Sequence, residues 1–406
     1  MNEGPLKGVR VVEVAQFVFV PSGGAVLADW GAEVIKVEHA ERGDPQRGFA
    51  NKSNVVTNVN AGLEHANRGK RSIGLALDHP DARTVLYELI AEADVFLTNY
   101  LPKARRRLSI DVEDIRKVNP DIIYARGSNV GPAGNEANRG GFDLGTFWAR
   151  GAGAAGVSPK KLDKMLTMPS PAYGDTIAGT TLAGGIAAAL FQRERTGKTS
   201  VVDVSLLGTA AWATGMAVDL SLATNVGWEP PTLEHLASTS NPLVGAYPTS
   251  DGRYIQLVMN RPGLYWQDFC THIDRADLPA DERFSTVELL MTNASEAEAI
   301  IAKEIGAKPF KFWLKRFETL KGQWSIVQDT LQLGNDEQLR ANGHVTSVTG
   351  ADGSEYELVT SPVQFDTTPI QLDRAPTFAE HTDELLRSLG HTEESLIDLK
   401  VSGAVT

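Results

Sequence analysis

The chain has 406 residues, of which 42% are hydrophobic and 22% charged, the balance of a water-soluble globular protein. Its formal net charge of −12 argues against broad nucleic-acid binding, which needs a clustered excess of Lys and Arg. No apolar run approaches the ~20 residues of a membrane helix, and residues 1–10 lack the features of a signal peptide. We therefore expect a cytoplasmic protein with two domains, or one large α/β domain with an insertion.

The first 130 residues alternate between β-branched strands and helices. Strand, helix and strand within thirty residues form a βαβ unit, which implies a parallel sheet. The alternation therefore predicts an α/β fold with an open doubly wound, Rossmann-like parallel sheet. Strands are predicted at 9–14, 33–38, 72–77, 94–98 and 122–126, and helices at 25–30, 81–93 and 112–118.

The rest of the chain predicts a smaller α+β domain and a return to the large one. Residues 131–172 are predicted to be loops and short helices, and Pro-, Thr- and Asn-rich residues 222–242 a hinge. The predicted large domain covers residues 1–222 and 333–406, and the small domain 223–332. Further helices are predicted at 176–195, 333–343 and 375–390, a strand or strand-to-helix transition at 200–207, and hairpins at 247–258 and 345–365.

The single cysteine, Cys270, fits a reducing compartment, because one thiol makes no intramolecular disulfide. Its segment has the pattern of an amphipathic helix, which favours a buried structural thiol over a nucleophile. The eight histidines show no metal-ligand spacing, so no metal site is predicted.

Residues Gly151, Gly153 and Gly156 form a literal G-x-G-x-x-G, with Asp175 nineteen residues after the last glycine. A dinucleotide site would need a β-branched strand before the glycines and an apolar helix directly after them. The preceding residues 146–150 are not β-branched, and Pro159 interrupts the segment after the glycines. The motif is therefore interpreted as a chance match.

Two basic clusters, residues 67–72 and 103–107, adjoin predicted strands. Clustered Arg and Lys at strand ends suit a polyphosphate ligand, although solvated loops explain them equally well. Asp175 begins the long apolar helix predicted at 176–195. Spacing alone favours an N-cap there, and a nucleophile would also need a pocket and an electrophile.

Several segments together resemble the class III coenzyme A transferases, the family of formyl-CoA transferase and carnitine CoA-transferase. The likeness runs in order along nearly the whole chain, which makes it more specific than any single motif. It rests on residues 6–13, 27–38, 43–45, 67–72, 93–102, 119–124, 174–198, 202–206, 375–376 and 380–382.

The resemblance implies that Asp175 is the catalytic nucleophile and that coenzyme A or acyl-CoA is a substrate at the carboxyl ends of the first strands. It also implies an interlocked homodimer in which the small domain caps the partner's site. The residues implied to contact coenzyme A are Gln16, Val18, Phe19, His39, Asn67, Lys70, Arg71, Asn99 and Arg107, with Asp143 near the thioester.

The implied chemistry is an exchange between carboxylic acids through aspartyl anhydride and aspartyl-CoA intermediates, for which no permanently bound cofactor or metal is required. With an ordinary pKa of ~3.9, Asp175 is expected to be almost wholly ionised at pH 7. Proximity to the bound thioester would then compensate for the weak nucleophilicity of a carboxylate.

Two alternatives stay open. The α-methylacyl-CoA racemases share the fold and the Asp but carry a Gly-His-Asp stretch, which here is Gly141-Phe142-Asp143. The missing imidazole favours transfer over racemisation. A CoA-binding protein without catalysis is the other alternative. Formate or oxalate is disfavoured as a substrate, because residues 260–263 stand roughly where formyl-CoA transferase carries a run of glycines as a lid loop. Phe142, Phe147, Trp148 and Tyr173 suggest a larger apolar or aromatic acyl group, or equally well core packing.

Overall fold

The computed structural model describes residues 4–49, 59–230 and 240–406. The chain divides into unit 1, which comprises residues 1–154, 167–226 and 334–406, and unit 2, which comprises residues 155–166 and 227–333. The sequence analysis assigns residues 155–166 to the large domain, whereas the structure groups them with unit 2. Part of the predicted hinge, residues 231–239, lies outside the described residues.

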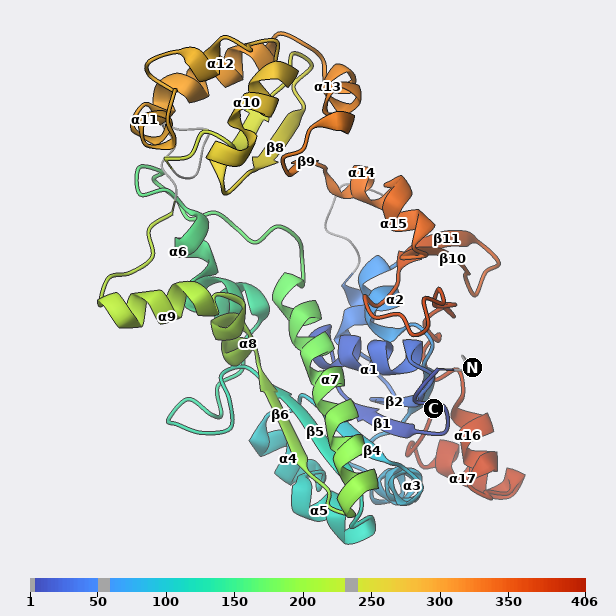
Figure 1. Cartoon of the computed structure of the whole chain (residues 1–406). Helices are drawn as coiled ribbons and strands as arrows, with labels where there is room; N and C mark the ends of the chain where they lie inside the picture. The colour runs from blue at the N-terminus through green and yellow to red at the C-terminus, as the bar shows by residue number, and fades with distance from the viewer. Residues whose placement is uncertain (1–3, 50–58, 231–239) are drawn as a thin grey trace. The chain divides into compact units, whose positions relative to one another are not determined.

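Unit 1 is built on a six-stranded sheet in which every neighbouring pair of strands is parallel (Figure 1). The order β3-β2-β1-β4-β5-β6 is that of a doubly wound dinucleotide fold, so the predicted parallel sheet is confirmed. The strand order reverses between β1 and β4, and ligands bind such folds at this point. The strands are β1 (Arg10–Val14), β2 (Glu33–Glu38), β3 (Arg71–Gly74), β4 (Val95–Thr98), β5 (Ile123–Ser128) and β6 (Val201–Ser205).

Each face of this sheet is covered by its own apolar core. Helices α1 and α7 pack on one face, while α3, α5, α16 and α17 pack on the other. The helices of unit 1 are α1 (Phe19–Asp29), α2 (Ala61–Asn67), α3 (Pro80–Ala91), α4 (Pro102–Leu108), α5 (Val112–Val118), a π-helical segment (Leu144–Arg150), α7 (Tyr173–Thr196), α8 (Leu206–Ala213), α9 (Gly215–Thr224), α15 (Glu337–Ala341), α16 (Thr382–Ser388) and α17 (Glu393–Val401), with a 3₁₀ turn at Pro45–Gly48.

Helix α1 begins at Phe19, six residues before its predicted start at residue 25. Its first turns contain one proline that costs no hydrogen bond and two glycines that close packing requires. Pro21 lies in the first turn, where a backbone N–H has no intrahelical partner to lose. A side chain on Gly24 would overlap Glu13, and one on Gly23 would approach the Gly179 carbonyl.

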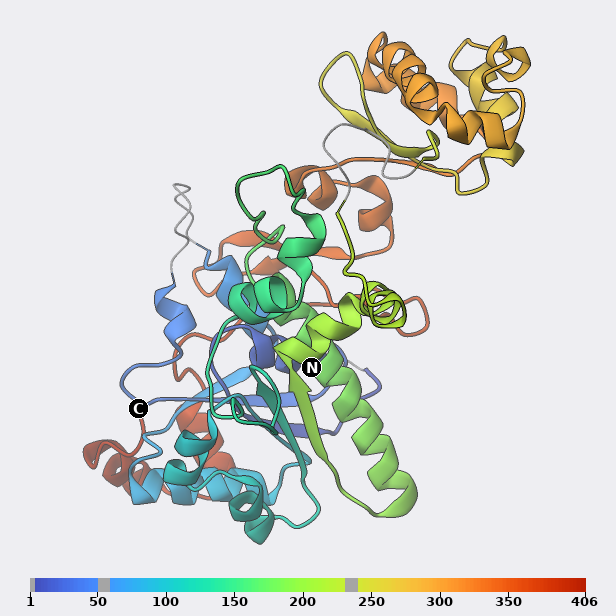
Figure 2. The same ribbon diagram turned by 90° about the vertical axis from the view of Figure 1, so that its left-hand side faces the viewer.

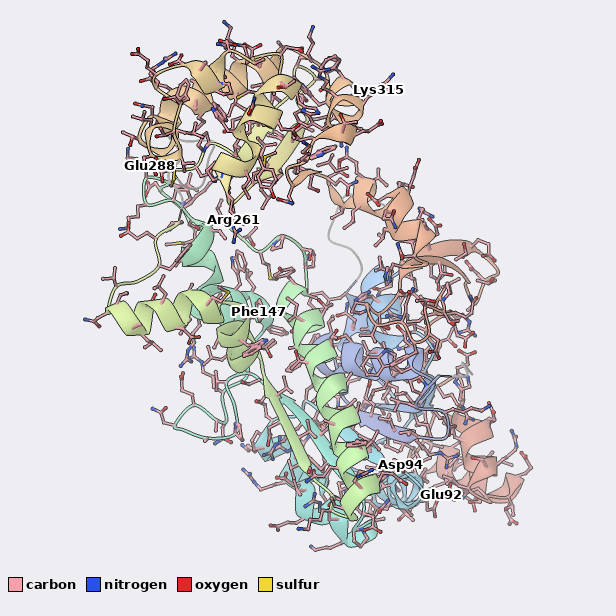
Figure 3. The ribbon with its side chains drawn as sticks, viewed as in Figure 1. Glu92, Asp94, Phe147, Arg261, Glu288 and Lys315 are labelled. Carbon is pink, nitrogen blue, oxygen red and sulfur yellow. The ribbon has the colours of Figure 1, made fainter. Side chains whose placement is uncertain are left out.

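Helices α1 and α7 cross in close contact because glycines line their interface (Figure 1). A Cβ on Gly179 would overlap Ser22 Oγ and lie 2.6 Å from the Phe19 carbonyl oxygen. At the other end of α7, Arg193 pairs at 2.6 Å with Asp94, which is labelled in Figure 3. The position of α7 relative to the sheet is thus fixed at both ends.

The last part of the chain returns to the core of unit 1, where α16 and α17 lie beside α3 (Figures 1 and 2). The predicted helix at 375–390 is wrong at its start, because α16 begins at Thr382. Ala379 adopts a left-handed backbone conformation with φ 55°, which interrupts a helix. Helix α17 was not predicted from the sequence.

Unit 2 contains a three-stranded antiparallel sheet of β7 (Val244–Pro248), β8 (Tyr254–Val258) and β9 (Trp324–Ile326). The predicted hairpin at 247–258 is therefore confirmed, as is the second hairpin, β10 (Val345–Thr349) and β11 (Glu355–Val359), in unit 1. Cys270 is buried in the core of unit 2. The helices of unit 2 are α10 (Pro262–His272), α11 (Val287–Thr292), α12 (Ala294–Gly306) and α13 (Phe310–Arg316). The sequence boundaries between the two units fall within two short helices, α6 (Gly153–Val157) and α14 (Thr330–Gly334).

Within the described ranges, no one helix has the length and apolarity to cross a bilayer. The bent pair α8 and α9, at 75° to each other, meets those criteria only when both are counted together. The same ranges hold no group of three or more His, Cys, Asp or Glu side chains arranged to bind a metal ion.

Candidate functional site

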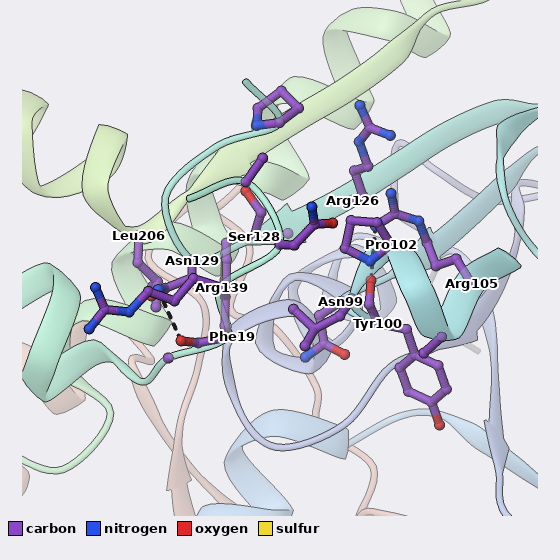
Figure 4. Close-up of a pocket in the computed structure, with 18 of the residues that line it drawn as sticks. Phe19, Asn99, Tyr100, Pro102, Arg105, Arg126, Ser128, Asn129, Arg139 and Leu206 are labelled. Carbon is purple, nitrogen blue, oxygen red and sulfur yellow. Dashed lines mark hydrogen bonds between the residues drawn. The ribbon is translucent and has the colours of Figure 1, made fainter. Parts of the chain in front are cut away.

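A cavity of about 950 Å³ opens at the carboxyl ends of β1, β4 and β5, where the strand order reverses. Figure 4 shows Phe19, Asn99, Tyr100 and Arg126 in its wall. Asp175, at the start of α7, also lines it. The predicted nucleophile therefore faces the place where this class of fold binds ligands.

A second cavity of about 440 Å³ lies beside the first. Its wall includes His39, Arg42 and Arg107 together with two carboxylates, Asp78 and Glu38, the latter paired with Arg47 at 2.6 Å. Gln16 and Tyr100 line both cavities. Because the Gln16 amide donates to the Tyr100 hydroxyl at 3.1 Å, one hydrogen-bonded pair stands at their common boundary.

Asp175 is the third residue of α7 rather than its N-cap, so the cap interpretation is wrong. The cap position is Ala172, which has a left-handed backbone (φ 57°) and a carbonyl that accepts from the Thr176 N–H. The Asp175 side chain is 9% exposed, and among the described residues no hydrogen-bond donor reaches its carboxylate. That carboxylate is therefore free to react within its cavity.

Asp143 performs the capping that the sequence analysis assigns to Asp175. One of its carboxylate oxygens accepts from the Leu144 N–H at 2.8 Å, and the other accepts from the Gly174 N–H at 3.2 Å. Asp143 is buried and holds together the starts of the π-helical segment and of α7. A second carboxylate is thereby fixed close to Asp175.

Burial, together with the charge of Asp143, raises the pKa of Asp175 to about 7. The expectation that Asp175 is almost wholly ionised at pH 7 is therefore corrected. A buried carboxylate that is poorly solvated and faces a like charge is more basic than an ordinary one, and hence a better nucleophile.

The backbone between β1 and α1 is held in an unusual conformation. The Asn99 side chain accepts from the Gln16 N–H at 3.0 Å and donates to the Gln16 carbonyl at 2.7 Å. Phe17 has a left-handed φ of 63°, and its N–H donates to Asp44 at 3.1 Å. Asn99 and Asp44 thus shape this edge of the first cavity.

The first basic cluster is used inside the fold and lines neither cavity. The Arg68 guanidinium pairs with Asp29 at 2.8 Å, and the fully buried Lys70 ammonium pairs with Glu13 at 2.8 Å. Arg71 pairs with Glu33 at 2.7 Å. These cations neutralise buried or partly buried carboxylates, so the structure gives them a structural role.

The second basic cluster reaches both cavities. Arg105 and Arg106 line the first cavity and Arg107 the second, and Arg105 is also paired with Asp111 at 3.1 Å. Among the described residues, the carboxylate that Arg107 pairs with is that of Asp78, at a distant 3.9 Å. Its guanidinium is therefore available to an anionic ligand.

The structure brings together only some of the residues that the resemblance implies. Gln16, Phe19, Asn99 and Asp175 line the first cavity, and Gln16, His39 and Arg107 line the second. Val18, directly before α1, lines neither cavity, and the same is true of Asn67, Lys70 and Arg71. Asp143 also lines neither cavity and instead accepts from the Gly174 N–H, next to Asp175. Cavity residues that the sequence analysis misses as site residues include Phe17, Arg42, Tyr100 and Arg126.

Two of the missed residues could have been found from position alone, since Phe17 follows Gln16 and Tyr100 follows Asn99 directly. Residues that come directly after parallel strands gather at one edge of the sheet. The structure agrees with the interpretation of the G-x-G-x-x-G motif as a chance match, because Gly151 follows a π-helical segment and not a strand.

Comparison with known proteins gives a family match over residues 6–382, to CoA-transferase family III. Cinnamoyl-CoA:phenyllactate CoA-transferase of Clostridium sporogenes is 32% identical over 98% of this chain and 97% of its own. (R)-2-hydroxy-4-methylpentanoate CoA-transferase of Clostridioides difficile is 31% identical over 98% of this chain and 99% of its own.

Among solved structures, Rv3272 from Mycobacterium tuberculosis superposes with a TM-score of 0.79 at 27% identity, over 95% of this chain and all of that one. A CAIB/BAIF family protein from Brucella suis superposes with a TM-score of 0.81 at 24% identity, over 96% and 100% of the two chains, and supports the fold alone.

Proposed function

Because the chain belongs to CoA-transferase family III, as its sequence resemblance indicates, we propose that it transfers coenzyme A from an acyl-CoA to a carboxylic acid through Asp175. The observation that carries the proposal is the buried carboxylate of Asp175 in the wall of the first cavity. Its high pKa supports a role as nucleophile.

Coenzyme A enters as a substrate, and the two adjoining cavities suit its two ends. The second cavity, with Arg42, Arg107 and His39, offers positive charge and hydrogen-bond donors to the nucleotide phosphates. The thioester end would pass Gln16 and Tyr100 and enter the first cavity, where Asp175 lies. The proposal thus assigns phosphate binding to the second cavity and chemistry to the first.

The reaction proceeds in four balanced steps. The Asp175 carboxylate attacks the thioester carbonyl, which forms a mixed anhydride and releases CoA thiolate. The thiolate attacks the Asp175 carbonyl, which forms aspartyl-CoA and releases the first acid. The acceptor carboxylate then displaces the thiolate to form a second anhydride, and the thiolate attacks the acceptor's carbonyl to give the new acyl-CoA and free Asp175.

Asp143 and the starts of two helices support these steps. The negative charge of Asp143 disfavours the ionised form of Asp175, so formation of an uncharged acyl derivative relieves a repulsion. First-turn N–H groups of α1 and α7 have no intrahelical acceptor. Apart from that of Gly174, which already donates to Asp143, they can donate to the oxyanions of the tetrahedral intermediates.

Racemisation is the alternative activity on the same fold. It needs an acid/base pair across the α-carbon, and position 142 carries a phenyl ring that cannot exchange protons. Incubation of a chiral 2-methylacyl-CoA in deuterated water without an acceptor acid tests this. We expect no deuterium at the α-carbon, and rapid incorporation would favour the racemase.

We also propose that the protein forms a homodimer. Trp212 on α8, and Met216 and Leu222 on α9, expose large apolar side chains, which a second subunit would cover. Light scattering should give the mass of two chains. Trp212→Glu should shift the mass toward one chain, while a monomeric parent protein would refute this part of the proposal.

The decisive experiment traps the covalent intermediate. The protein is incubated with acyl-CoA donors, quenched in acid, digested and analysed by mass spectrometry for CoA attached to the peptide of Asp175. Asp175→Asn should abolish both adduct and transfer, whereas Asp398→Asn, a matched change of an exposed carboxylate on α17, should leave both unchanged. Full transfer by Asp175→Asn would disprove the nucleophile.

A further inference from the structure

Two phenylalanine rings in the wall of the first cavity have no role in the core. Phe142 is 62% exposed, and Phe17 is half-buried. Both line the cavity that contains Asp175. Their centroids lie 5.4 Å apart with the ring planes at 90°, and Phe17 also meets Phe49 edge to face at 6.1 Å. Phe142, the more exposed of the two rings, therefore offers the larger open surface to an apolar group.

Phe147 and Trp148, two other aromatic residues near the start of α7, are buried instead. Phe147, labelled in Figure 3, is only 5% exposed, and a Cβ on Gly174 would overlap its ring. Trp148 is also buried, and its ring meets that of Tyr173 edge to face. Phe147 and Trp148 therefore pack against the start of α7, and core packing explains them but not Phe142.

The backbone at or next to both rings is constrained. Phe17 keeps a left-handed φ of 63°, which glycine would adopt without strain. A bulky residue retained in a strained conformation beside a reactive group points to a function of its side chain. Before Phe142, a Cβ on Gly141 would lie 2.5 Å from the Asn129 amide oxygen, so the loop packs closely there.

We propose that Phe17 and Phe142 form the acyl-binding surface, and that this site takes thioesters of acids bearing an aryl or similarly large apolar group. This inference rests on the proposed function, because the acyl carbonyl must reach Asp175 in the same cavity. An apolar group seated on the two rings leaves water and gains contacts that a short acyl group cannot make.

The half-reaction tests the inference without knowledge of the acceptor acid. Excess enzyme converts acyl-CoA to aspartyl-CoA and free acid in a single turnover, which mass spectrometry follows. Phenylacetyl-CoA and acetyl-CoA form a matched pair that differs by one phenyl group. Phe142→Ala should slow release of phenylacetate by about tenfold, the worth of one good aromatic contact, and release of acetate by less than about twofold.

Two further variants separate recognition from folding. Phe191→Ala removes an exposed ring (67% exposed) from α7 outside the cavity and should change neither rate. Phe17→Gly relieves the backbone strain, so its thermal unfolding midpoint should not fall, yet it should slow the phenylacetyl reaction selectively. Equal slowing of both donors by Phe142→Ala, or no slowing, would overturn the acyl surface. Absence of an Asp175 adduct from the parent protein with every donor would instead overturn the proposed function.

Discussion

The backbone N–H of Gly174 donates to the Asp143 carboxylate at 3.2 Å, one residue before Asp175. This contact stabilises the first turn of α7 and places a second buried carboxylate beside the proposed nucleophile. The local structure and the electrostatics of the site therefore depend on the same side chain.

Asp143→Asn should lower the pKa of Asp175, because it removes the like charge while burial stays. The pH at which kcat/KM reaches half its maximum should move to lower pH. The rate at high pH should fall, since the Asp175 carboxylate becomes a weaker nucleophile. A profile that keeps the parent midpoint would show that Asp143 does not act on Asp175 electrostatically.

In the parent protein, activity should rise with pH through about 7 and level off above, because only ionised Asp175 attacks a thioester. Stability should show the opposite trend. A carboxyl whose folded pKa is raised is protonated in the folded state while already ionised in the unfolded state, so its contribution falls as pH rises between about 4 and 7.

Asp175→Asn removes this pH-dependent cost. Relative to the parent, its free energy of unfolding should increase as pH rises from about 4 to 7, by at most about 4 kcal/mol for three pKa units. Urea unfolding at pH 5 and pH 8 measures the difference. A variant that gains no stability at pH 8 would contradict a buried, destabilised carboxylate.

The two basic clusters should respond differently to mutation. Lys70→Met leaves the buried Glu13 carboxylate without this partner and should destabilise unit 1 by about 3 to 5 kcal/mol. Arg107→Ala should barely change stability but raise the KM for acyl-CoA by about tenfold, the worth of one charged contact to phosphate. Arg387→Ala, an exposed arginine paired with Glu393, is the control and should change neither quantity. An unchanged KM in Arg107→Ala would remove the second cavity from the CoA site.

The two basic clusters also show which features of the site could not be predicted from local sequence patterns. Alternating β-branched and helical segments are local patterns, so the strands from β1 to β5 could be predicted from them. Whether a lysine is free or neutralised depends on residues far away in the sequence, and Glu13 lies 57 positions before Lys70. The same holds for Asp143, whose hydrogen bond to Gly174 spans 31 positions. The role of Asp175 as nucleophile came from family resemblance, since spacing alone favoured a cap.

Glycines on α7 provide a matched pair that tests how the nucleophile is positioned. A Cβ on Gly179 would overlap Ser22 Oγ, and Ser22 also approaches the Asp175 carbonyl oxygen at 3.4 Å. Gly179→Ala should therefore push α1 and α7 apart, destabilise the protein by about 1 to 3 kcal/mol, as overpacking does, and displace Asp175. Because about 1 Å of misplacement costs on the order of a hundredfold in rate, transfer should fall by at least tenfold.

Gly184 lies on an exposed face of the same helix, and a Cβ there meets nothing within 4 Å. Gly184→Ala should stabilise the protein by about 0.5 to 1 kcal/mol, because alanine loses less backbone entropy in a helix, and should leave the transfer rate unchanged. Thermal unfolding and single-turnover adduct formation measure both effects. If Gly179→Ala kept the parent rate, close packing of α1 on α7 would not be what holds Asp175 in place.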